Sequence, residues 1–540
     1  MFDTDQTSLP QYRNQAPIYS RFISRRNYII RLTLVGLLLG TTIWITLIKP
    51  LVESESSIIL SDSANAEKQN TEPTQPMWQT DIKEVIDGRF SLFKKEQFTE
   101  VALNKNGMIP VTAVLLGWKR MESLQIVVNY ISKYPFIKEI LIWNNNNKMR
   151  IYAKDFILNN SEVTLNVFNS EKNLHDLSKY TTCSMAKYDY CYFQDYNWLN
   201  LYMDSLYTNF LNNPSLIHSN TMPINYLEHK RWMFANSDKN LHTGFTRLGC
   251  GSFASRAKVQ RFLGQLGSIS LMKDRLKFAD VYFSLWTNQY PYQLSNPLIT
   301  LDKKDGWKAG VNQWNVDQWN LFYNNILDAT QKLYTALAVK SGSELFAPEE
   351  EQPYYNDRDA RAPCLNDNCL FLTNIDPFPH PSRVYYANNI THVHDQEAKF
   401  NELDFPENSF WENHAYHHAV DLNERTCWNS FKIPKIGDYF GLQFVKPIFS
   451  EKITIVSTKD IRNFDASFNI LVSLDGNEWL KCTGIHSDSI GYTFTRITLK
   501  FNCPDIAKTK QLFNYIRVEA SRNFTEPLEI CSLMLDGLSV

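Results

Sequence analysis

Polar, cationic and aromatic residues directly follow two short apolar segments of the sequence. The first group is WKR at 118–120, and the second is NNNN at 144–147. Together these groups suit a ligand with a phosphate, hydroxyls and a flat base, because cations and amides bind phosphate and hydroxyl oxygens and aromatic rings stack. The same pattern also fits an ordinary α/β core unit with polar loops.

Asp195 and Asn197 lie two residues apart on a predicted turn after an aromatic strand, in YCYFQDYN. A carboxylate at the end of a strand, with a second oxygen ligand two residues later, can hold a divalent metal on a nucleotide diphosphate. The pair therefore predicts a site for Mn²⁺ or Mg²⁺. The alternative is a plain turn, which Asp and Asn favour in any case.

Asp280 lies within KFADVYFSLWTN, a mainly apolar and aromatic segment. A buried carboxylate is costly unless it is paired, so Asp280 is a candidate functional residue, with a helix N-cap as the alternative. Gly249 and Gly251 precede a helix-like run, AKVQRFLGQLG. Small residues at such a turn let the backbone approach a ligand closely, or they merely turn the chain.

The spacing of apolar residues predicts the elements that position these groups. VTAVLL (111–116) and IKEILIW (137–143) read as buried strands, and the residues at 124, 127, 128 and 131 form the apolar stripe of a helix between them. Such a unit predicts a parallel strand pair with a right-handed crossover, and ligands bind beyond the carboxyl ends of such strands. TLNVF (164–168) predicts a third strand, followed by the loop NSEKNLHDLSKY. A further helix is expected around residues 319–337.

Length and composition limit the classes of protein that need be considered. A chain of 540 residues suggests about two to four domains. The formal net charge of −2 provides no basic field for nucleic acid, so no nucleic-acid partner is expected. The 13 Trp, 27 Tyr and 33 Phe suit stacking on sugars, although a large core is the more common use of such residues.

The N-terminal region predicts a membrane anchor. Residues 1–27 are polar and contain four arginines, and residues 32–48 carry no charge. We expect a cytosolic tail (1–27), a transmembrane signal anchor (28–49) and a polar stem (50–108), with the remaining chain in the lumen. A cleaved signal peptide is the alternative. The predicted protein is a single-pass type II protein of the Golgi or ER membrane.

Two further features agree with a lumenal location. Glycosylation sequons occur at Asn159, Asn389 and Asn523. An oxidising lumen permits disulfides, and the nine cysteines are odd in number, so at least one is unpaired within the chain. Cys364 with Cys369, and Cys482 with Cys503, are possible pairs, but spacing alone does not fix the pairing.

The pattern changes after residue 340. Residues 341–363 are acidic and rich in proline, which indicates a linker, placed at 341–384. Short alternating segments follow, among them YFGLQFV, KITIVST, FNILVSL and NYIRVEA, and they predict an all-β sandwich over 385–540. His414, His417 and His418 have a spacing that could ligate a metal on a helix, or they lie on a solvated surface.

The segment from about residue 109 to 300 resembles the exostosin-type (family 64) glycosyltransferases. VLLGWKR, EILIWNNN and NSEKNLHDLSKY are similar to their strand ends and to the loop before a basic residue. The resemblance implies a GT-A (Rossmann-like) domain at 109–340 that uses a nucleotide-sugar donor and retains anomeric configuration. It also implies roles for individual residues: nucleotide-sugar contacts from Arg120, Asn144, Asn173, Lys179 and Asp195, acceptor-side positions at Gly249 and Gly251, and a catalytic position at Asp280.

One departure from the family pattern concerns the metal site. The family has a run of Asp residues where this chain has Gln194, Asp195, Tyr196 and Asn197, so Asn197 stands in the place of a metal-binding carboxylate. A neutral amide still coordinates, but it lacks the charge that attracts Mn²⁺ or Mg²⁺. We therefore expect either weak metal binding or an impaired site.

Residues 385–540 resemble the discoidin, or coagulation factor 5/8 type C, sandwich. AVDLNERTCWNS, LVSLDGNEW and NYIRVEA are similar to the signature segments of that family. Such modules bind glycans, lipid head groups or proteins through loops at one end, although the domain could instead be a stabilising appendage.

The sequence thus predicts a membrane-anchored glycosyltransferase acting on a glycan or glycolipid acceptor. The resemblance suggests UDP-N-acetylhexosamine as donor, with GDP-mannose as the alternative. A catalytically impaired glycan-binding or scaffolding protein is the second hypothesis, and a surface adhesion receptor is the third.

Overall fold

The structure is a computed structural model of the chain. It describes residues 108–223, 225–226, 232–269, 271–301, 316–339, 343–347, 359–377, 413–459, 466–490, 495–503 and 512–535. All of these belong to one compact unit, Asp81–Val540. The expected tail, anchor and stem, together with the sequon at Asn389, lie outside the described residues. Among the helices that are described, none is both long and apolar enough to cross a membrane.

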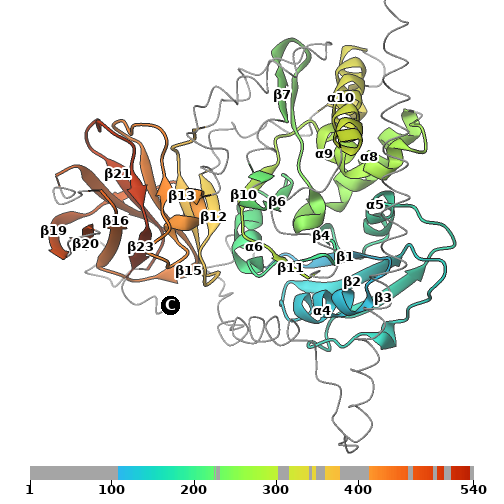
Figure 1. Cartoon of the computed structure of the whole chain (residues 1–540), viewed down its shortest axis with the longest axis horizontal. Coiled ribbons are helices and arrows are strands. Elements are labelled where there is room, and N and C mark those ends of the chain that lie inside the picture. The colour runs from blue at the N-terminus through green and yellow to red at the C-terminus, as the bar shows by residue number, and fades with distance from the viewer. Residues whose placement is uncertain are drawn as a thin grey trace, which may run out of the picture. The chain divides into compact units, whose positions relative to one another are not determined.

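A seven-stranded sheet forms the centre of the N-terminal part (Figure 1). Its strands are β1 (Val111–Gly117), β2 (Ile137–Asn144), β3 (Thr164–Asn169), β4 (Tyr190–Gln194), β6 (His218–Thr221), β9 (Ser252–Ser255) and β10 (Tyr292–Ser295), in the order β10-β6-β9-β4-β1-β2-β3. The pairing of β1 with β2 is parallel, as the sequence predicted. β9 runs antiparallel to both β4 and β6, so the other six strands share one direction.

The strand order reverses at β1. β2 and β3 follow β1 on one side, whereas β4, β9, β6 and β10 extend the sheet on the other side. In open α/β sheets, ligands bind outside the carboxyl ends of the strands at such a reversal. The fold therefore brings the end of β1 and the end of β4 to the place where a ligand is expected.

Six helices with bounds inside the described residues accompany this sheet. They are α4 (Met121–Ile131), α5 (Leu177–Ser184), α6 (Met203–Asn212), α8 (Arg256–Ser268), α9 (Ala279–Trp286) and α10 (Val316–Ala338). The predicted apolar stripe of α4 is confirmed, since Leu124, Val127, Val128 and Ile131 are all buried. Residues of α5, α8, α9 and α10 share one hydrophobic cluster with β1 and β4, so these helices cover the same face of the sheet. Two small ribbons complete this part: β5 (Trp198–Leu199) with β11 (Ile299–Thr300), and β7 (Met233–Asn236) with β8 (Leu241–Gly244).

The C-terminal part is an all-β sandwich, as predicted. Its six-stranded sheet contains β12 (Ala360–Pro363), β13 (Cys369–Thr373), β15 (Tyr439–Ile448), β17 (Phe468–Ser473), β18 (Leu480–Lys481) and β21 (Phe513–Ala520). Its four-stranded sheet contains β16 (Lys452–Ser457), β19 (Thr483–Ile490), β20 (Thr495–Asn502) and β23 (Ser532–Leu535), and β14 (Trp428–Asn429) pairs separately with β22 (Glu529–Ile530). Buried residues of both sheets form a single core cluster.

The sandwich begins earlier in the chain than the expected boundary at residue 385. β12 and β13 lie within 341–384, the range assigned to a linker, yet they form one edge of the six-stranded sheet. Strand β12 is only ARAP, which carries no alternating pattern over a useful length. The Cys364–Cys369 disulfide closes the connection between the two strands.

Four disulfides pair eight of the nine cysteines. Cys364–Cys369 and Cys482–Cys503 are the pairs that the sequence made possible. Cys183–Cys191 and Cys427–Cys531 were not anticipated. Cys250 is the unpaired cysteine that the odd count required, and its thiol is buried.

A carboxylate from the sandwich binds the start of helix α6. Asp367, in the turn between β12 and β13, accepts the backbone N–H groups of Asp204 at 2.9 Å and Ser205 at 3.0 Å. The Ser205 hydroxyl donates in return to the carbonyl of Cys369 at 3.1 Å. The first N–H groups of a helix have no partner inside the helix, and a negative charge there is stabilising. Asp367 therefore caps a helix that lies far earlier in the chain.

Removing the Cys427–Cys531 disulfide is expected to destabilise the sandwich more than removing Cys364–Cys369. The first pair closes a separation of 104 residues and the second a separation of 5. Because the chain entropy lost by cross-linking grows with loop length, the Cys427→Ala/Cys531→Ala variant should cost about 2–5 kcal/mol, roughly 3 kcal/mol more than the matched Cys364→Ala/Cys369→Ala variant. Urea unfolding of both variants measures the difference. Equal losses would contradict the entropic account.

Candidate functional site

Lys179 lies at the centre of a charged group at the carboxyl edge of the sheet. Its ammonium nitrogen is 3.0 Å from Asp280 Oδ2, 3.2 Å from Asp195 Oδ1 and 3.5 Å from Asp176 Oδ1. The lysine side chain is only 2% exposed. One buried cation thus joins three carboxylates from different parts of the chain, and we call these four residues the lysine cluster.

Three neighbouring elements position the lysine cluster. Lys179 lies in α5, which follows β3, and Asp195 is the first residue after β4. Asp280 lies in the first turn of α9, about 100 residues later. The disulfide Cys183–Cys191 joins α5 directly to β4, which fixes the helix that carries Lys179 against the strand that leads to Asp195.

Tyr180 holds the second oxygen of the Asp280 carboxylate. Its hydroxyl donates to Asp280 Oδ1 at 2.8 Å, while Lys179 donates to Asp280 Oδ2 at 3.0 Å. The tyrosine ring is fully buried among Phe262 and Phe283. Both oxygens of Asp280 are therefore fixed from α5, and the alternative of a simple helix N-cap does not describe this residue.

The charges of the lysine cluster shift the protonation of its members. Burial alone would lower the pKa of Lys179, but the carboxylates of Asp176, Asp195 and Asp280 together raise it well above its ordinary value. Partial burial raises the pKa of Asp176. Lys179 opposes this upward shift, and the carboxylates of Asp280 and Asp195 add to it. Burial and the neighbouring Asp280 raise the pKa of Tyr180. The lysine is therefore a permanent cation, and the tyrosine is a permanent hydrogen-bond donor.

The two glycines lie against the site at very close range. A methyl group added at Gly249 would lie 2.0 Å from Asp195 Oδ2, and the Asp195 N–H donates to the Gly249 carbonyl at 2.8 Å. Gly251 has φ +102°, and a methyl group there would lie 2.7 Å from the Tyr192 hydroxyl. The close approach predicted for this turn was to a ligand, whereas the structure shows Gly249 lying against Asp195 of the chain itself. A role on the acceptor side stays a prediction.

Arg120 and Asn197 connect the ends of β1 and β4. Arg120 Nη1 donates to Asn197 Oδ1 at 3.0 Å. The amide oxygen that the sequence assigned to a metal therefore faces a guanidinium group, and the Asp195 oxygen nearest the lysine faces an ammonium group at 3.2 Å.

This arrangement does not fit a divalent cation, because both expected ligands face cations of the chain. Over the ranges that the structure covers, no three or more His, Cys, Asp or Glu side chains are placed so that they could hold a metal ion as they stand, with Lys179 among the carboxylates. Binding of Mn²⁺ or Mg²⁺ stays a prediction that the geometry does not support.

The structure places Asn144 and Asn173 in local loop contacts. Asn144 is fully buried, and its amide donates to the Met149 carbonyl at 2.5 Å and to Asn169 Oδ1 at 2.9 Å. Asn173 Oδ1 accepts the His175 N–H at 2.8 Å. These contacts shape the loops beside the site, so the nucleotide contacts expected of both residues stay predictions. The expected residues that the structure brings together are Arg120 with Asn197, and Lys179 with Asp195, Asp280 and, through Asp195, Gly249.

Asp176 and Tyr180 were not singled out from the sequence, and Asn145 was named only as part of the NNNN segment at 144–147. Asp176 and Tyr180 belong to the lysine cluster or contact it. Asn145 ties the end of β2 to the segment before α5, since its amide donates to Ser178 Oγ at 3.0 Å and accepts the Leu174 N–H at 3.0 Å. The spacing of Asp176 and Lys179, three residues apart at the start of a helix, was the one available signal for a local ion pair.

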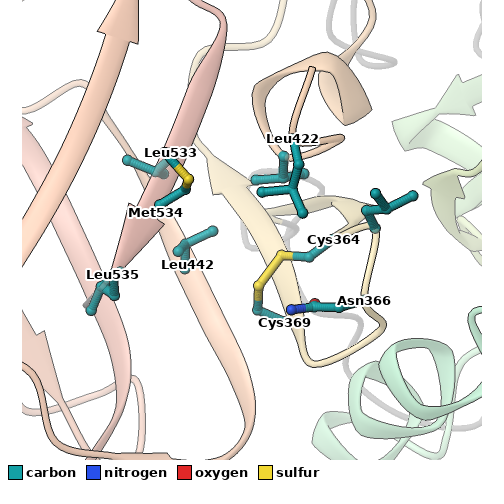
Figure 2. A pocket seen from close by; sticks show the side chains of 10 residues that line it. Cys364, Asn366, Cys369, Leu422, Leu442, Leu533, Met534 and Leu535 are labelled. Carbon is teal, nitrogen blue, oxygen red and sulfur yellow. A yellow bond between two sulfur atoms is a disulfide. The ribbon is translucent and has the colours of Figure 1, made fainter. Parts of the chain in front are cut away.

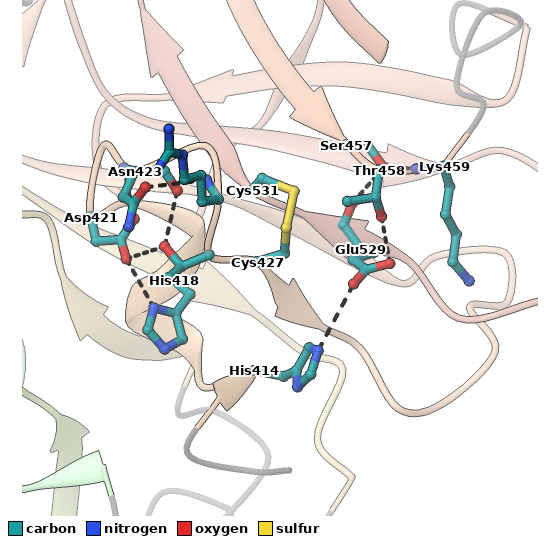
Figure 3. Close-up of a disulfide and its surroundings, with 12 residues drawn as sticks. His414, His418, Asp421, Asn423, Cys427, Ser457, Thr458, Lys459, Glu529 and Cys531 are labelled. Atoms are coloured by element: carbon teal, nitrogen blue, oxygen red, sulfur yellow. Dashed lines mark hydrogen bonds and ion pairs between the residues drawn. A yellow bond between two sulfur atoms is a disulfide. The ribbon is translucent and has the colours of Figure 1, made fainter. Parts of the chain in front are cut away.

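The signature residues of the sandwich hold its own loops. Asp421 accepts the Asn423 N–H at 3.0 Å (Figure 3) and the Thr426 hydroxyl at 2.6 Å. Trp428 is buried in the core. In the later segment, Asp475 accepts the N–H groups of Asn477 and Glu478. These residues therefore explain the fold of the loops and do not by themselves identify a ligand.

The three histidines are partly covered rather than solvated. His417 packs on His418 with ring centroids 4.0 Å apart. His418 contacts Asp421 at 2.9 Å, and His414 lies 3.9 Å from Glu529 (Figure 3). Burial, and to a smaller degree the neighbouring His418, lower the pKa of His417 to about 3, against the pull of Asp421. The two outer histidines each face a carboxylate, so the structure gives no shared metal site here.

The stability of the sandwich is expected to fall in mild acid because of His417. Its folded pKa of about 3 lies below the ordinary value of 6.5, so the neutral ring stabilises the fold fully above pH 6.5, and that stability is lost as the pH falls toward 3. At 1.36 kcal/mol per pKa unit, the loss between pH 7 and pH 4 should be on the order of 2–3 kcal/mol. His417→Asn should unfold in urea with a weaker dependence on pH, and His414→Asn is the matched control. Identical pH profiles for His417→Asn and the wild type would contradict the assignment.

One small pocket lies between the Cys364–Cys369 hairpin and β23 (Figure 2). Its volume is about 30 Å³, and its walls are mostly apolar, with Leu422, Leu442 and Leu533 among them.

Comparisons with known proteins find likenesses of structure but not of sequence. No family model matches the chain, and no curated protein matches it. A carbohydrate-binding module of Clostridium perfringens, CpGH89CBM32-5 in complex with GalNAc-β-1,3-galactose, is 20% identical over 22% of this chain and 81% of its own, with a TM-score of 0.18. A pectin-binding module is 14% identical over 24% and 84%, with a TM-score of 0.17. The paired modules of Clostridium perfringens ZmpB are 15% identical over 41% and 50%, with a TM-score of 0.20. With TM-scores below 0.5, these likenesses do not identify a function for this chain.

Proposed function

We propose that the α/β domain is a glycosyltransferase that moves a sugar from a nucleotide donor to a glycan or glycolipid. One observation carries the proposal: Asp195 and Asp280, far apart in the sequence, both contact Lys179 at the carboxyl edge of a mostly parallel sheet, beside the point where the strand order reverses. Such an edge is where nucleotides bind in open α/β sheets. The resemblance to exostosin-type enzymes assigns these same positions to donor binding and catalysis.

The residues of the site have distinct roles in this proposal. Arg120 and the polar groups after β1 and β2 bind the nucleotide. The Asp280 carboxylate faces the anomeric carbon and stabilises the positive charge that develops there as the bond to the diphosphate breaks. The acceptor hydroxyl forms the new bond to that carbon, and its proton passes to the departing diphosphate. Tyr180 and Lys179 keep Asp280 in position throughout.

The proposed setting is the lumen of the Golgi or ER, with the chain held as a type II membrane protein. The four disulfides support an oxidising compartment. The sequons at Asn159 and Asn523 lie on exposed residues, as glycosylation requires. UDP-N-acetylhexosamine is the first donor to test, and GDP-mannose is the second.

Calorimetry of the full chain with donor nucleotides tests this function. We expect UDP or GDP, together with the matching nucleotide sugar, to bind the wild type, and Arg120→Ala to weaken that binding at least about tenfold, since a charged hydrogen bond contributes about 1.5–3 kcal/mol. Arg256→Ala is the matched control, because Arg256 pairs with Asp189 away from the site. A panel of nucleotide sugars and glycan acceptors then identifies the pair that is consumed. Binding of no nucleotide at all would overturn the proposal.

A catalytically impaired glycan-binding or scaffolding protein is the second candidate. Two observations favour it. Lys179 already forms ion pairs with Asp195 and Asp280, the carboxylates that a reacting sugar would need, and Asn197 stands in the place of an acid. Under this alternative the sandwich would carry glycan binding. Nucleotide binding without hydrolysis or transfer, across the whole donor panel, would favour it.

A further inference from the structure

The carboxylates of the lysine cluster are arranged around one point, which the ammonium nitrogen of Lys179 occupies. Three oxygens, one from each of Asp176, Asp195 and Asp280, lie 3.0–3.5 Å from that nitrogen. They reach it from a helix start, a strand end and a second helix. Three carboxylates converging on one point form a donor set that hard divalent cations favour.

We propose that Lys179 is the resident cation of this site, and that it holds Asp176, Asp195 and Asp280 together in the position that a divalent metal ion would otherwise take. The charge balance of the lysine cluster supports this assignment, because three carboxylates around one buried point repel one another unless at least one cation lies between them. The contact of Asn197 with Arg120 agrees with it, because Asn197, the other expected metal ligand besides Asp195, accepts from a second side-chain cation at 3.0 Å. The site therefore assembles without a metal ion.

The lysine side chain also fills the space that an ion would need. The Lys179 side chain is 2% exposed, whereas that of Asp195 is 32% exposed. Lys179→Ala removes the charge and leaves room, so the three carboxylates can close by about 1 Å to the 2.3–2.6 Å that calcium-like ions prefer. Lys179→Met removes the charge but keeps the space filled.

Metal-binding measurements on the full chain, with no nucleotide present, test the proposal. The probes are Tb³⁺ by luminescence, which nearby Tyr180 can sensitise, and Mn²⁺ by calorimetry. We expect Lys179→Ala to bind each ion at least tenfold more tightly than the wild type, and its melting temperature to rise with Mn²⁺ while that of the wild type does not. Lys179→Met should show a smaller gain, and Lys138→Ala, which breaks the surface pair with Glu162, should show none.

Two results would overturn the proposal: wild-type protein that binds Mn²⁺ as tightly as Lys179→Ala, or a folded Lys179→Ala that gains no affinity. If Lys179→Ala does not fold alone, recovery of folded protein only in the presence of Mn²⁺ supports the proposal. The double variant Lys179→Ala/Asp176→Asn carries one carboxylate fewer and serves as the second test. It should still bind the ions more tightly than the wild type, and the absence of this gain would contradict the proposal. None of these outcomes depends on sugar transfer, so a metal-binding gain without nucleotide binding would reject only the proposed function.

Discussion

Asp280→Asn is expected to abolish sugar transfer while the affinity for nucleotide stays within a few-fold of the wild type. The amide keeps an oxygen that can accept from Tyr180, but it has no negative charge to stabilise the anomeric centre. Loss of one such electrostatic group costs about a hundredfold to a thousandfold in kcat, and loss of a charge at the reacting atom should cost at least as much. Donor consumption followed by chromatography measures the rate, and calorimetry measures the affinity.

A matched variant separates this effect from a change in fold. Asp328 is likewise a partly buried carboxylate in a cation network, with Arg275 at 3.2 Å and a second contact to Lys332, but it lies on α10 away from the lysine cluster. Asp328→Asn should retain transfer. Normal turnover of Asp280→Asn would remove Asp280 from the reaction.

Gly249→Ala is expected to be the second most damaging change. The added methyl carbon would lie 2.0 Å from Asp195 Oδ2 and 2.5 Å from its Cγ, distances that no pair of unbonded atoms adopts. The Asp195 side chain must rotate away, which breaks its 3.2 Å contact with Lys179. Because a displacement of about 1 Å can cost a hundredfold in rate, we expect transfer to fall at least about a hundredfold. Thermal unfolding should change less, since Asp195 is partly exposed and can move toward solvent.

Gly264→Ala provides the control for this substitution. Gly264 lies in α8, and a methyl group there would have nothing within 4 Å. Alanine in a helix interior is more favourable than glycine by about 1 kcal/mol, so this variant should keep its activity and melt at a higher temperature. Unchanged activity in Gly249→Ala would mean that the position of Asp195 does not matter to the reaction.

The regular elements of the fold were predictable because their signals are local. The apolar stripe at 124–131 and the two flanking apolar runs predicted the β1–α4–β2 unit, and the structure confirms its parallel pairing. In the sandwich, the alternation in YFGLQFV and NYIRVEA predicted β15 and β21. Strand β12 was missed, because four residues that include a proline carry no usable period.

The lysine cluster was predictable only in part. Lys179, Asp195 and Asp280 were each identified, but as separate contacts to a nucleotide, a metal and a sugar. That they contact one another depends on how β4, α5 and α9 pack, and no spacing in the sequence records a contact across 100 residues. The same holds for the pair Arg120 and Asn197, which are 77 residues apart. Of these contacts, local spacing could have indicated only the ion pair of Asp176 with Lys179, which lie three residues apart.

The cap that Asp367 places on α6 has a consequence for how the two domains can be separated. A fragment that ends at residue 340 would keep every residue assigned to the reaction, yet its helix α6 would begin with the N–H groups of Asp204 and Ser205 lacking their carboxylate. The loop at 364–369 therefore stabilises a helix of the neighbouring domain, although the strands on either side of it pair within the sandwich. Swapping in a sandwich from another protein would succeed only if the incoming module brought an equivalent acid to that helix.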